Sequence, residues 1–397
     1  YKLVYDEDSN TIDDITWDDL DMDLVYKRIN NCQTSIGEEY LYDTLHNLQG
    51  DENLLLKREK LMSYLENNPE ERLKLQMSLA KAGKFSHNGI VSFIFNPESK
   101  SLKYDFLYNV LAIIPILSIL ISFFNMQAGI SNLIFSVVIN VLVYYKTKNK
   151  IDIELSAVKY FLSILTCLNE MFKNKDYDSL TFFDELHKSF KVFKHLRKKL
   201  SSLTYKNHSD MGILEEYINI IFLTDIRNFN KAVKTICKNS EDFHTLYKSL
   251  GEIDMGISVL SFRNSLPTYC RPSFHGENSI SFEEFYHPLL TDPVTSSAKI
   301  SKDSIITGSN ASGKSTFIKA LAVNSILAQT IYTCAAASFN LRFSLIITSM
   351  AVRDNIVEGD SYFIKEIKSL KRILDKAEET PCTCFIDEIL KGTKSIS

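Results

Sequence analysis

The chain has 397 residues, of which 45% are hydrophobic and 24% are charged, so it is long enough for two or three domains. Its formal net charge of −4 argues against a protein that is electropositive over its whole surface, so any nucleic-acid-binding surface must be local. Seven cysteines without a C-x-x-C pair argue against a disulfide framework or a zinc site and fit a reducing, cytosolic setting.

The first 24 residues are rich in aspartate and glutamate. We interpret them as a solvated opening segment rather than a metal site, and no signal peptide pattern is present. Apolar spacing and cap residues then predict helices over about 22–30, 35–48 and 52–66. In the second of these, Leu41, Leu45 and Leu48 share one face.

Residues 106–145 contain no Asp, Glu, Lys, Arg or His and are mostly Leu, Ile, Val and Phe. They divide at 125–129 into two runs of about 20 residues, each long enough to cross a bilayer. Lysines flank the pair on both sides, so the positive-inside rule predicts a multi-pass membrane hairpin whose two flanks are cytoplasmic. The alternative is a hairpin buried in a large soluble helical domain, although such a hairpin normally carries charge on an exposed face.

A long helical region follows the hairpin, with apolar residues at helical spacing from Leu155 to Leu168 and from Phe190 to Leu196. The stretch 188–199 carries six lysines and arginines. These residues could contact acidic lipid headgroups or nucleic-acid phosphates, or they could form the solvated face of a helix. Prolines and a glycine at 267–276 break the helical pattern and mark a domain boundary, after which a short strand is predicted at 279–282.

A glycine-rich loop at 308–315 matches the phosphate-binding pattern G-x-x-x-x-G-K-S. The apolar run 304–307 before it predicts a short buried strand, and residues 316–330 after it predict a helix. In this setting backbone N–H groups and the helix N-terminus bind phosphate oxygens, Lys314 reaches the β- and γ-phosphates, and the Ser315 hydroxyl binds Mg²⁺. The predicted ATP-binding residues are Gly308, Ser309, Asn310, Ala311, Ser312, Gly313, Lys314, Ser315 and Thr316.

A second element, 381–388, is an apolar strand that ends in two carboxylates. In nucleotide hydrolases such a strand lies beside the phosphate loop, and its Asp holds Mg²⁺. We therefore predict Asp387 as a metal residue and Glu388 as the base that polarises the attacking water, with Lys314 as the second catalytic residue. Because the chain stops soon after Glu388, we expect the end of the nucleotide-binding domain to be missing.

These segments resemble the MutS family of mismatch-repair ATPases. Residues 307–316 are similar to its T-G-P-N-x-x-G-K-S-T loop, and Asp387-Glu388-Ile389-Leu390-Lys391-Gly392-Thr393 is similar to D-E-[IL]-G-R-G-T. Residues 286–290, 327–329 and 33–37 also resemble family segments. The resemblance implies a dimer with composite ATP sites, in which Ser361, within the family-like segment 354–366, completes the partner's site.

The departures concern Ser309, where the family has Pro, and Asp360, where it has Arg. We expect no mismatch-reading domain with the family's Phe-x-Glu wedge in this sequence. The predicted hairpin lies near where the DNA clamp would be nested. The resemblance therefore implies a membrane-anchored relative of MutS in which DNA is a possible ligand.

The fold class we expect is an α/β P-loop NTPase, an ABC-type ATPase domain that is incomplete at its C-terminus, preceded by an all-α MutS-core-like domain containing the hairpin. The predicted segments are helical core 1–104, hairpin 105–146, helical lever region 147–272 and ATPase domain 273–397. The predicted function is an ATP-driven clamp acting on DNA, with ATP and Mg²⁺ as cofactors, and the family resemblance implies a homodimer. A membrane-tethered conformational ATPase with a protein or lipid partner and no DNA role is the alternative, and a transporter ATPase fits less well because two spans are too few for a translocation path.

Overall fold

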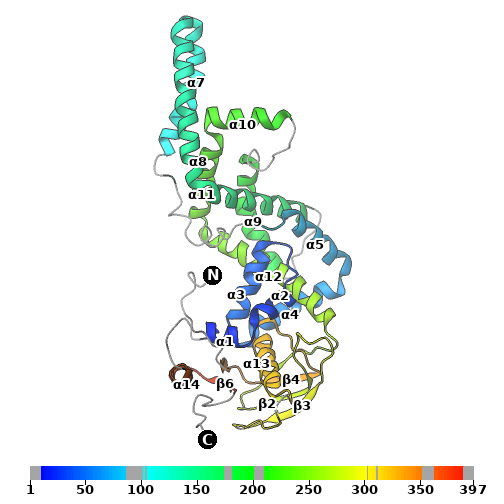
Figure 1. The fold of residues 1–397 in the computed structure, drawn as a ribbon. Coiled ribbons are helices and arrows are strands. Elements are labelled where there is room, and N and C mark those ends of the chain that lie inside the picture. The colour runs from blue at the N-terminus through cyan, green and yellow to red at the C-terminus, as the bar shows by residue number, and fades with distance from the viewer. Residues whose placement is uncertain are drawn as a thin grey trace. The chain divides into compact units, whose positions relative to one another are not determined.

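The computed structural model of the protein describes residues 10–85, 102, 105–173, 181–200, 210–301, 303–309, 312–350 and 362–387 (Figure 1). The chain forms two compact units, Tyr1–Leu73 with Gly251–Ser397, and Lys74–Leu250. The first unit therefore joins N-terminal helices to the region that carries the phosphate-loop pattern.

The helices of the first unit follow the sequence-based expectation closely. The predicted helices at 22–30, 35–48 and 52–66 are confirmed, and side-chain caps fix the starts of the second and third. Thr34 Oγ1 accepts from Gly37 N (3.0 Å), and Asp51 Oδ1 accepts from Asn53 N (2.8 Å). The helices are α1 (Asp14–Asp19), α2 (Met22–Ile29), α3 (Ser35–His46), α4 (Glu52–Asn67), α13 (Lys314–Ile331), α14 (Tyr362–Glu379), the start of α5 (Pro69–Ala82) and the end of α12 (Ser240–Ser265).

The strands of this unit form two small sheets. The larger has the order β1-β4-β2-β3, in which only the β1–β4 pair is parallel, and the smaller is the parallel pair β5–β6. The chain is therefore mostly helical with small sheets, and the expected α/β character is limited to these strands. The strands are β1 (Ser273–Phe274), β2 (Ile280–Phe285), β3 (Ser296–Ile300), β4 (Ser338–Leu341), β5 (Leu345–Ser349) and β6 (Cys382–Ile386).

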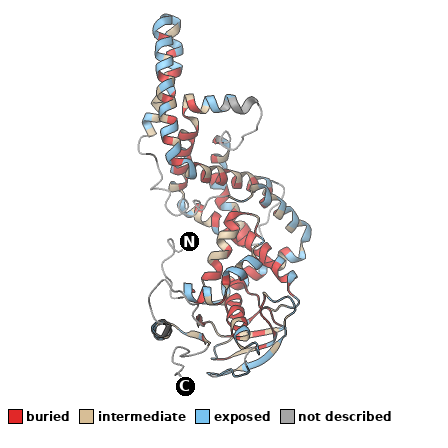
Figure 2. Ribbon diagram, in the orientation of Figure 1, coloured by how far each residue is buried: buried red, intermediate tan, exposed pale blue. Residues whose placement is uncertain are grey.

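Helix α13 forms the centre of the core in the first unit. Figure 2 shows it buried along most of its length, and every residue from Ala320 to Ile331 is buried. Near its start, Phe317 packs edge-on against Phe285 of β2, with 5.0 Å between the ring centroids. Burial on all sides agrees with its composition, which is apolar or small around most of the helix. The helix thus fixes the position of the loop that precedes it.

The expectation of a solvated opening segment is wrong for the part of it that the structure describes. Ile12, Trp17 and Leu20 are buried, and Trp17 stacks on His46 with 3.6 Å between ring centroids. The aspartates alternate with these apolar residues, and several of them bind the C-terminal region of the same unit. The high acidic content concealed this apolar pattern.

The second unit is entirely helical in its described residues, and α7 and α8 form a hairpin within it. Its helices are α7 (Asp105–Phe124), α8 (Met126–Met171), α9 (Thr181–Lys199), α10 (Asp210–Phe222), α11 (Thr224–Lys238) and parts of α5 and α12. The turn lies where it was predicted, but it is shorter than the predicted 125–129, because only Asn125 separates the two helices. Asn125 caps α8 by accepting from Ala128 N (3.1 Å). The chain turns tightly there because Gly129 has no side chain; a Cβ at that position would lie 2.3 Å from Ser122 Cα.

The exposed face of α9 carries the basic stretch. Phe190, Phe193 and Leu196 are buried, whereas Lys188, Lys191 and Lys194 are exposed. The helical spacing predicted here is confirmed. A contact of these lysines with lipid or nucleic acid remains a prediction.

Candidate nucleotide site and its supports

The glycine-rich loop lies directly before α13, as the sequence predicts. Gly313 is the N-cap residue, its φ is +85°, and no side chain caps the helix. Glycine is favoured in this left-handed conformation, because a Cβ would strain the backbone. The first N–H groups of α13 are thus left to bind a ligand, which is the arrangement that suits a phosphate.

Lys314 folds back over the loop. Its Nζ donates to the carbonyl oxygens of Gly308 and Ser309, both at 2.8 Å. Ser312 N also donates to Ser309 O (3.2 Å), so the loop curls around the lysine amine. Ser315 and Thr316, in the first turn of α13, are exposed. The residues present therefore fit a bound nucleoside triphosphate, with Lys314 as the cation and the Ser315 hydroxyl available to Mg²⁺.

The predicted strand before the loop is not formed. Residues 304–307 belong to neither sheet, Ile305 is 91% exposed and Ile306 is 39% exposed. An apolar run becomes a strand only where a neighbouring strand supplies hydrogen-bond partners for its backbone. In the part of the chain that the structure describes, β5 and β6 pair only with each other, so that prediction was wrong for this segment.

Asp387 follows β6, where the sequence placed it. Its N–H donates to Ser349 O of β5 (3.0 Å), and its side chain is half-buried. Among the described residues, no hydrogen bond or ion pair joins Asp387 to Lys314 or Ser315, and no group of three His, Cys, Asp or Glu side chains could hold a metal alone. Mg²⁺ usually takes one or two protein ligands together with phosphate oxygens, so these residues would complete a site with the nucleotide. Asn310, Ala311, Ser361 and Glu388 lie outside the described residues.

The family-like segment 286–290 packs against α13. Asn324 of α13 donates to Tyr286 O (3.0 Å) and accepts from Ala335 N (2.7 Å), while Tyr286 N donates to Ala335 O (3.0 Å). Next to it, burial lowers the pKa of His287 to about 4; the nearby Lys319 also lowers it, and Asp21 opposes the shift. His287 is therefore a neutral, buried side chain at neutral pH.

The far end of α13 is held by a buried ion pair that sequence analysis missed. Arg58 of α4 donates to Glu252 of α12 through Nε and Nη2 at 2.9–3.1 Å, and through Nη1 to the carbonyl of Thr330 (2.6 Å). Tyr40 also donates to Glu252 (2.8 Å). Arg58 and Glu252 are almost fully buried, and the partners satisfy a carbonyl at the end of α13 that has no partner within the helix.

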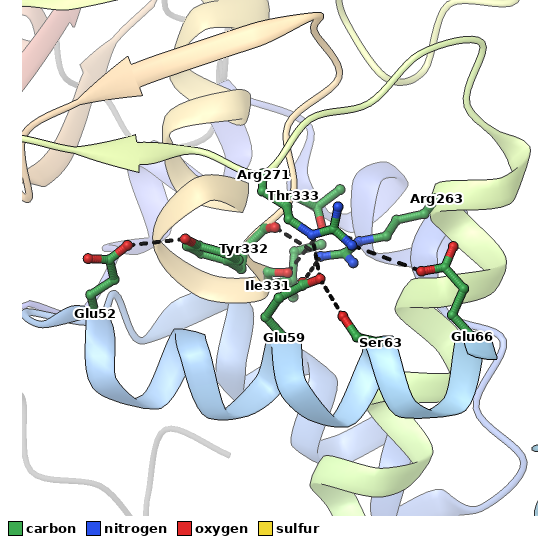
Figure 3. A network of polar contacts seen from close by, with 9 residues as sticks. All are labelled: Glu52, Glu59, Ser63, Glu66, Arg263, Arg271, Ile331, Tyr332 and Thr333. Atoms are coloured by element: carbon green, nitrogen blue, oxygen red, sulfur yellow. Dashed lines mark hydrogen bonds and ion pairs between the residues drawn. The ribbon is translucent and has the colours of Figure 1, made fainter. Parts of the chain in front are cut away.

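A second arginine, Arg263 of α12, holds the chain just after α13 (Figure 3). It donates to Tyr332 O (3.0 Å), to Thr333 Oγ1 (2.9 Å) and to Glu59 of α4 (2.7 Å). Burial would raise the pKa of Glu59, but hydrogen bonds from Arg263 and Arg271 outweigh it and lower the pKa. Both arginines are charged side chains at positions of helical apolar spacing, and this is the sequence signal that could have found them.

Aspartates near the N-terminus form a third set of contacts that hold α13 and its neighbouring elements. Asp19 Oδ2 accepts from Thr348 Oγ1 (2.8 Å) and Met350 N (2.9 Å) at the end of β5. Lys319, in the second turn of α13, donates to Asp21 (2.7 Å), and Arg372 of α14 pairs with Asp13. The acidic opening segment thus links α13, whose first turn carries Lys314 and Ser315, to β5 and α14.

Comparison with known proteins finds similarity in the region that contains the glycine-rich loop and α13. Residues 304–397 match the family model of MutS domain V. Similar proteins include MutS protein homolog 4 of Mus musculus (33% identity, 41% of this chain and 18% of that protein), DNA mismatch repair protein MutS of Leptospira interrogans (27%, 42% and 21%) and DNA mismatch repair protein Msh3 of Homo sapiens (31%, 40% and 15%). The matched region spans about a fifth of the length of these relatives or less. Together with the loop and helix described above, these matches show that the C-terminal region of the chain is similar to domain V of the MutS family.

Proposed function

We propose that the protein binds and hydrolyses ATP with Mg²⁺ and uses the cycle to drive a conformational change, as a membrane-anchored MutS-type clamp that acts on DNA. The observation that carries the ATP-binding part is the loop itself. Gly313 is in the left-handed conformation, the start of α13 has no side-chain cap, and Lys314 points back over the loop.

Each residue of the site has a separate task. The loop amides and Lys314 bind the phosphates, Ser315 and Asp387 hold Mg²⁺, and Glu388 orients water. Bound Mg²⁺ would neutralise charge on the phosphate oxygens. Positioning and charge stabilisation supply most of such catalysis, so small displacements of α13 or β6 change its rate.

The ATPase proposal is tested by two variants of the detergent-solubilised protein. Lys314→Ala removes the cation and should weaken ATP binding in a nucleotide-binding titration. Glu388→Gln keeps the loop and should retain binding while abolishing turnover. If Glu388→Gln hydrolyses ATP at the full rate, Glu388 is not the base; if neither variant changes binding or turnover, the loop is not the ATP site.

The membrane anchor is supported by the side chains of the α7–α8 hairpin, in which large apolar residues face outward and small or polar residues are buried. The apolar windows of both helices are only 17% buried, and Figure 2 shows the hairpin largely exposed. Small or polar residues fill the buried seam instead, as is common where helices pack in lipid. The seam residues are Ala112, Pro115, Ser118, Gly129, Ser136 and Asn140. A hairpin buried in a soluble domain would have its leucines and isoleucines inside, so this pattern favours the membrane.

Two functional classes remain distinct within this proposal. In the first, the protein acts on DNA, either in mismatch repair, as the names of two relatives indicate, or in recombination. In the second, it acts on a protein or lipid without binding DNA. Retention of DNA that weakens steeply as salt rises would support the first class. Absence of DNA retention at low salt, with ATPase activity intact, would support the second.

The dimer is a further part of the proposal. Ser361 of each subunit would complete the site of the other, so binding of ATP would close the dimer. A heterodimer of a Ser361→Ala subunit and a Lys314→Ala subunit has one intact site. Once separated from both homodimers, it should keep about half of the wild-type turnover if the two sites act independently. If Ser361→Ala has no effect in any pairing, Ser361 has no role across the dimer.

A further inference from the structure

We infer that α10 is a membrane-surface helix, which lies in the interface of the same bilayer that the α7–α8 hairpin enters. This inference rests on the hairpin part of the proposed function and adds a second membrane contact of a different kind.

The first observation is an exposed apolar stripe on α10. Leu214 is 60% exposed, Tyr217 61% and Ile218 44%. Their spacing of three and four residues places them on one side of the helix, whereas the exposed Glu216 lies on the opposite side. A helix with one apolar side and one charged or polar side is the kind that lies in the plane of a membrane interface. Tyrosine is also common at that depth.

The second observation is that α10 is hydrogen-bonded to the hairpin at one position along the axis of the hairpin. Asn140 of α8 is fully buried and donates from Nδ2 both to Leu111 O of α7 (3.0 Å) and to Ile221 O of α10 (2.6 Å). The same amide therefore joins all three helices. Figure 1 shows α10 running across the axis of the hairpin instead of along it.

The distance of this hydrogen-bonded position from the charged ends of the hairpin agrees with the depth of a membrane interface. Charged contacts mark the base of the hairpin: Lys234 pairs with Asp105 (2.6 Å), at the start of α7. Leu111 lies six residues beyond Asp105 and Asn140 six residues before Lys146, which is about 9 Å along either helix at a rise of 1.5 Å per residue. Interfacial helices bury their apolar side about 5–10 Å into the boundary between headgroups and acyl chains.

In water this stripe would need a protein partner to cover it, but the hairpin to which α10 is bonded also exposes apolar side chains at this height. Val138 and Leu142 on α8, close to Asn140 in the chain, are 52% and 66% exposed. The occupant that fits both surfaces at this height is lipid. Leu214, Tyr217 and Ile218 then insert among acyl chains, and Glu216 faces the aqueous side.

Fluorescence quenching by brominated lipid tests the placement. Trp17 is the only tryptophan of the chain and is buried, so it gives an unquenched background. The full chain carrying Tyr217→Trp, Glu216→Trp or Phe135→Trp is reconstituted in phosphatidylcholine vesicles brominated at a shallow or a deep acyl position. Phe135, 68% exposed in the middle of the apolar part of α8, reports on the hairpin alone.

The expected result is a loss of Tyr217→Trp emission that is greater with the shallow-brominated lipid, a much smaller loss for Glu216→Trp, and a loss for Phe135→Trp that is greater with the deep-brominated lipid. If Phe135→Trp is quenched and Tyr217→Trp is not, the inference is overturned while the hairpin stands. Equal quenching of Tyr217→Trp and Glu216→Trp overturns the orientation proposed for α10. If none of the three is quenched, the hairpin and the inference both fail.

Discussion

Arg58 Nη1 donates a 2.6 Å hydrogen bond to the carbonyl oxygen of Thr330, 272 residues away in the chain. This contact attaches α4 to the last turn of α13, whose first turn carries Lys314. The Glu252 carboxylate neutralises the Arg58 guanidinium, so neither buried charge is left unpaired. The position of α13 thus depends on Arg58 and Glu252, which lie at the far end of the helix and are not among the predicted nucleotide-binding residues.

Arg58→Met should lower the free energy of unfolding of the first unit by about 3–5 kcal/mol, because it leaves the Glu252 carboxylate buried and unpaired. The measurement is chemical denaturation followed by Trp17 fluorescence. Glu66→Gln is the matched control: Glu66 is exposed and 3.9 Å from Arg271, so its loss should cost at most about 1 kcal/mol. An equally small effect for Arg58→Met would show that the buried pair contributes little.

Asp19→Ala should destabilise the end of β5 by about 1–3 kcal/mol, since it removes the acceptor of Thr348 Oγ1 and Met350 N. The adjacent Asp18 is exposed, and Asp18→Ala should leave stability within about 0.5 kcal/mol. Thermal unfolding measures the difference, and hydrogen exchange at the Met350 amide should become faster only in Asp19→Ala. Identical behaviour of the two variants would contradict the structural role assigned to Asp19.

Stability should fall as the pH is lowered from about 6.5 to about 4, because in this window the unfolded chain binds a proton on His287 that the folded chain does not. The slope from this group is at most about 1.4 kcal/mol per pH unit and vanishes below the folded pKa. His287→Asn keeps an acceptor for the Leu289 N–H (3.3 Å) and should flatten the profile in this window. An unchanged slope in His287→Asn would mean that other groups cause the acid sensitivity.

A hairpin that crosses the bilayer should keep the protein in the membrane fraction through carbonate washing, because its exposed side chains are almost all apolar. A tag inserted at Gln127, next to the turn, should be labelled from outside intact cells, while a tag inserted at Asn149, just beyond the apolar run, should not. Release of the protein by carbonate, or labelling of both tags, would refute this topology.

The features that sequence predicted well are those set by local chemistry. Thr34 and Asp51 start helices through hydrogen bonds to residues two or three positions ahead, and Asn125 does the same at the hairpin turn. The glycine-rich loop and the start of α13 are likewise determined by residues that are close together in the sequence.

The features that sequence did not predict depend on distant partners. Nothing near Arg58 indicates that Glu252 will neutralise it, and nothing near Asp19 indicates that β5 will bind it. The run 304–307 has the composition of a strand, but strand formation also needs neighbours, and Ile305 is instead exposed. Local pattern alone therefore described the helices better than the sheets.

The two hydrogen bonds from Lys314 to its own loop have a consequence for the energetics of ligand capture. A free lysine side chain loses about 1.5–2 kcal/mol of rotamer entropy when it is ordered. Here the amine is already held by Gly308 and Ser309 carbonyls, so that loss has occurred before a phosphate arrives. Capture then becomes an exchange of two neutral acceptors for anionic oxygens, which favours a preorganised site whose affinity depends on charge and little on chain ordering.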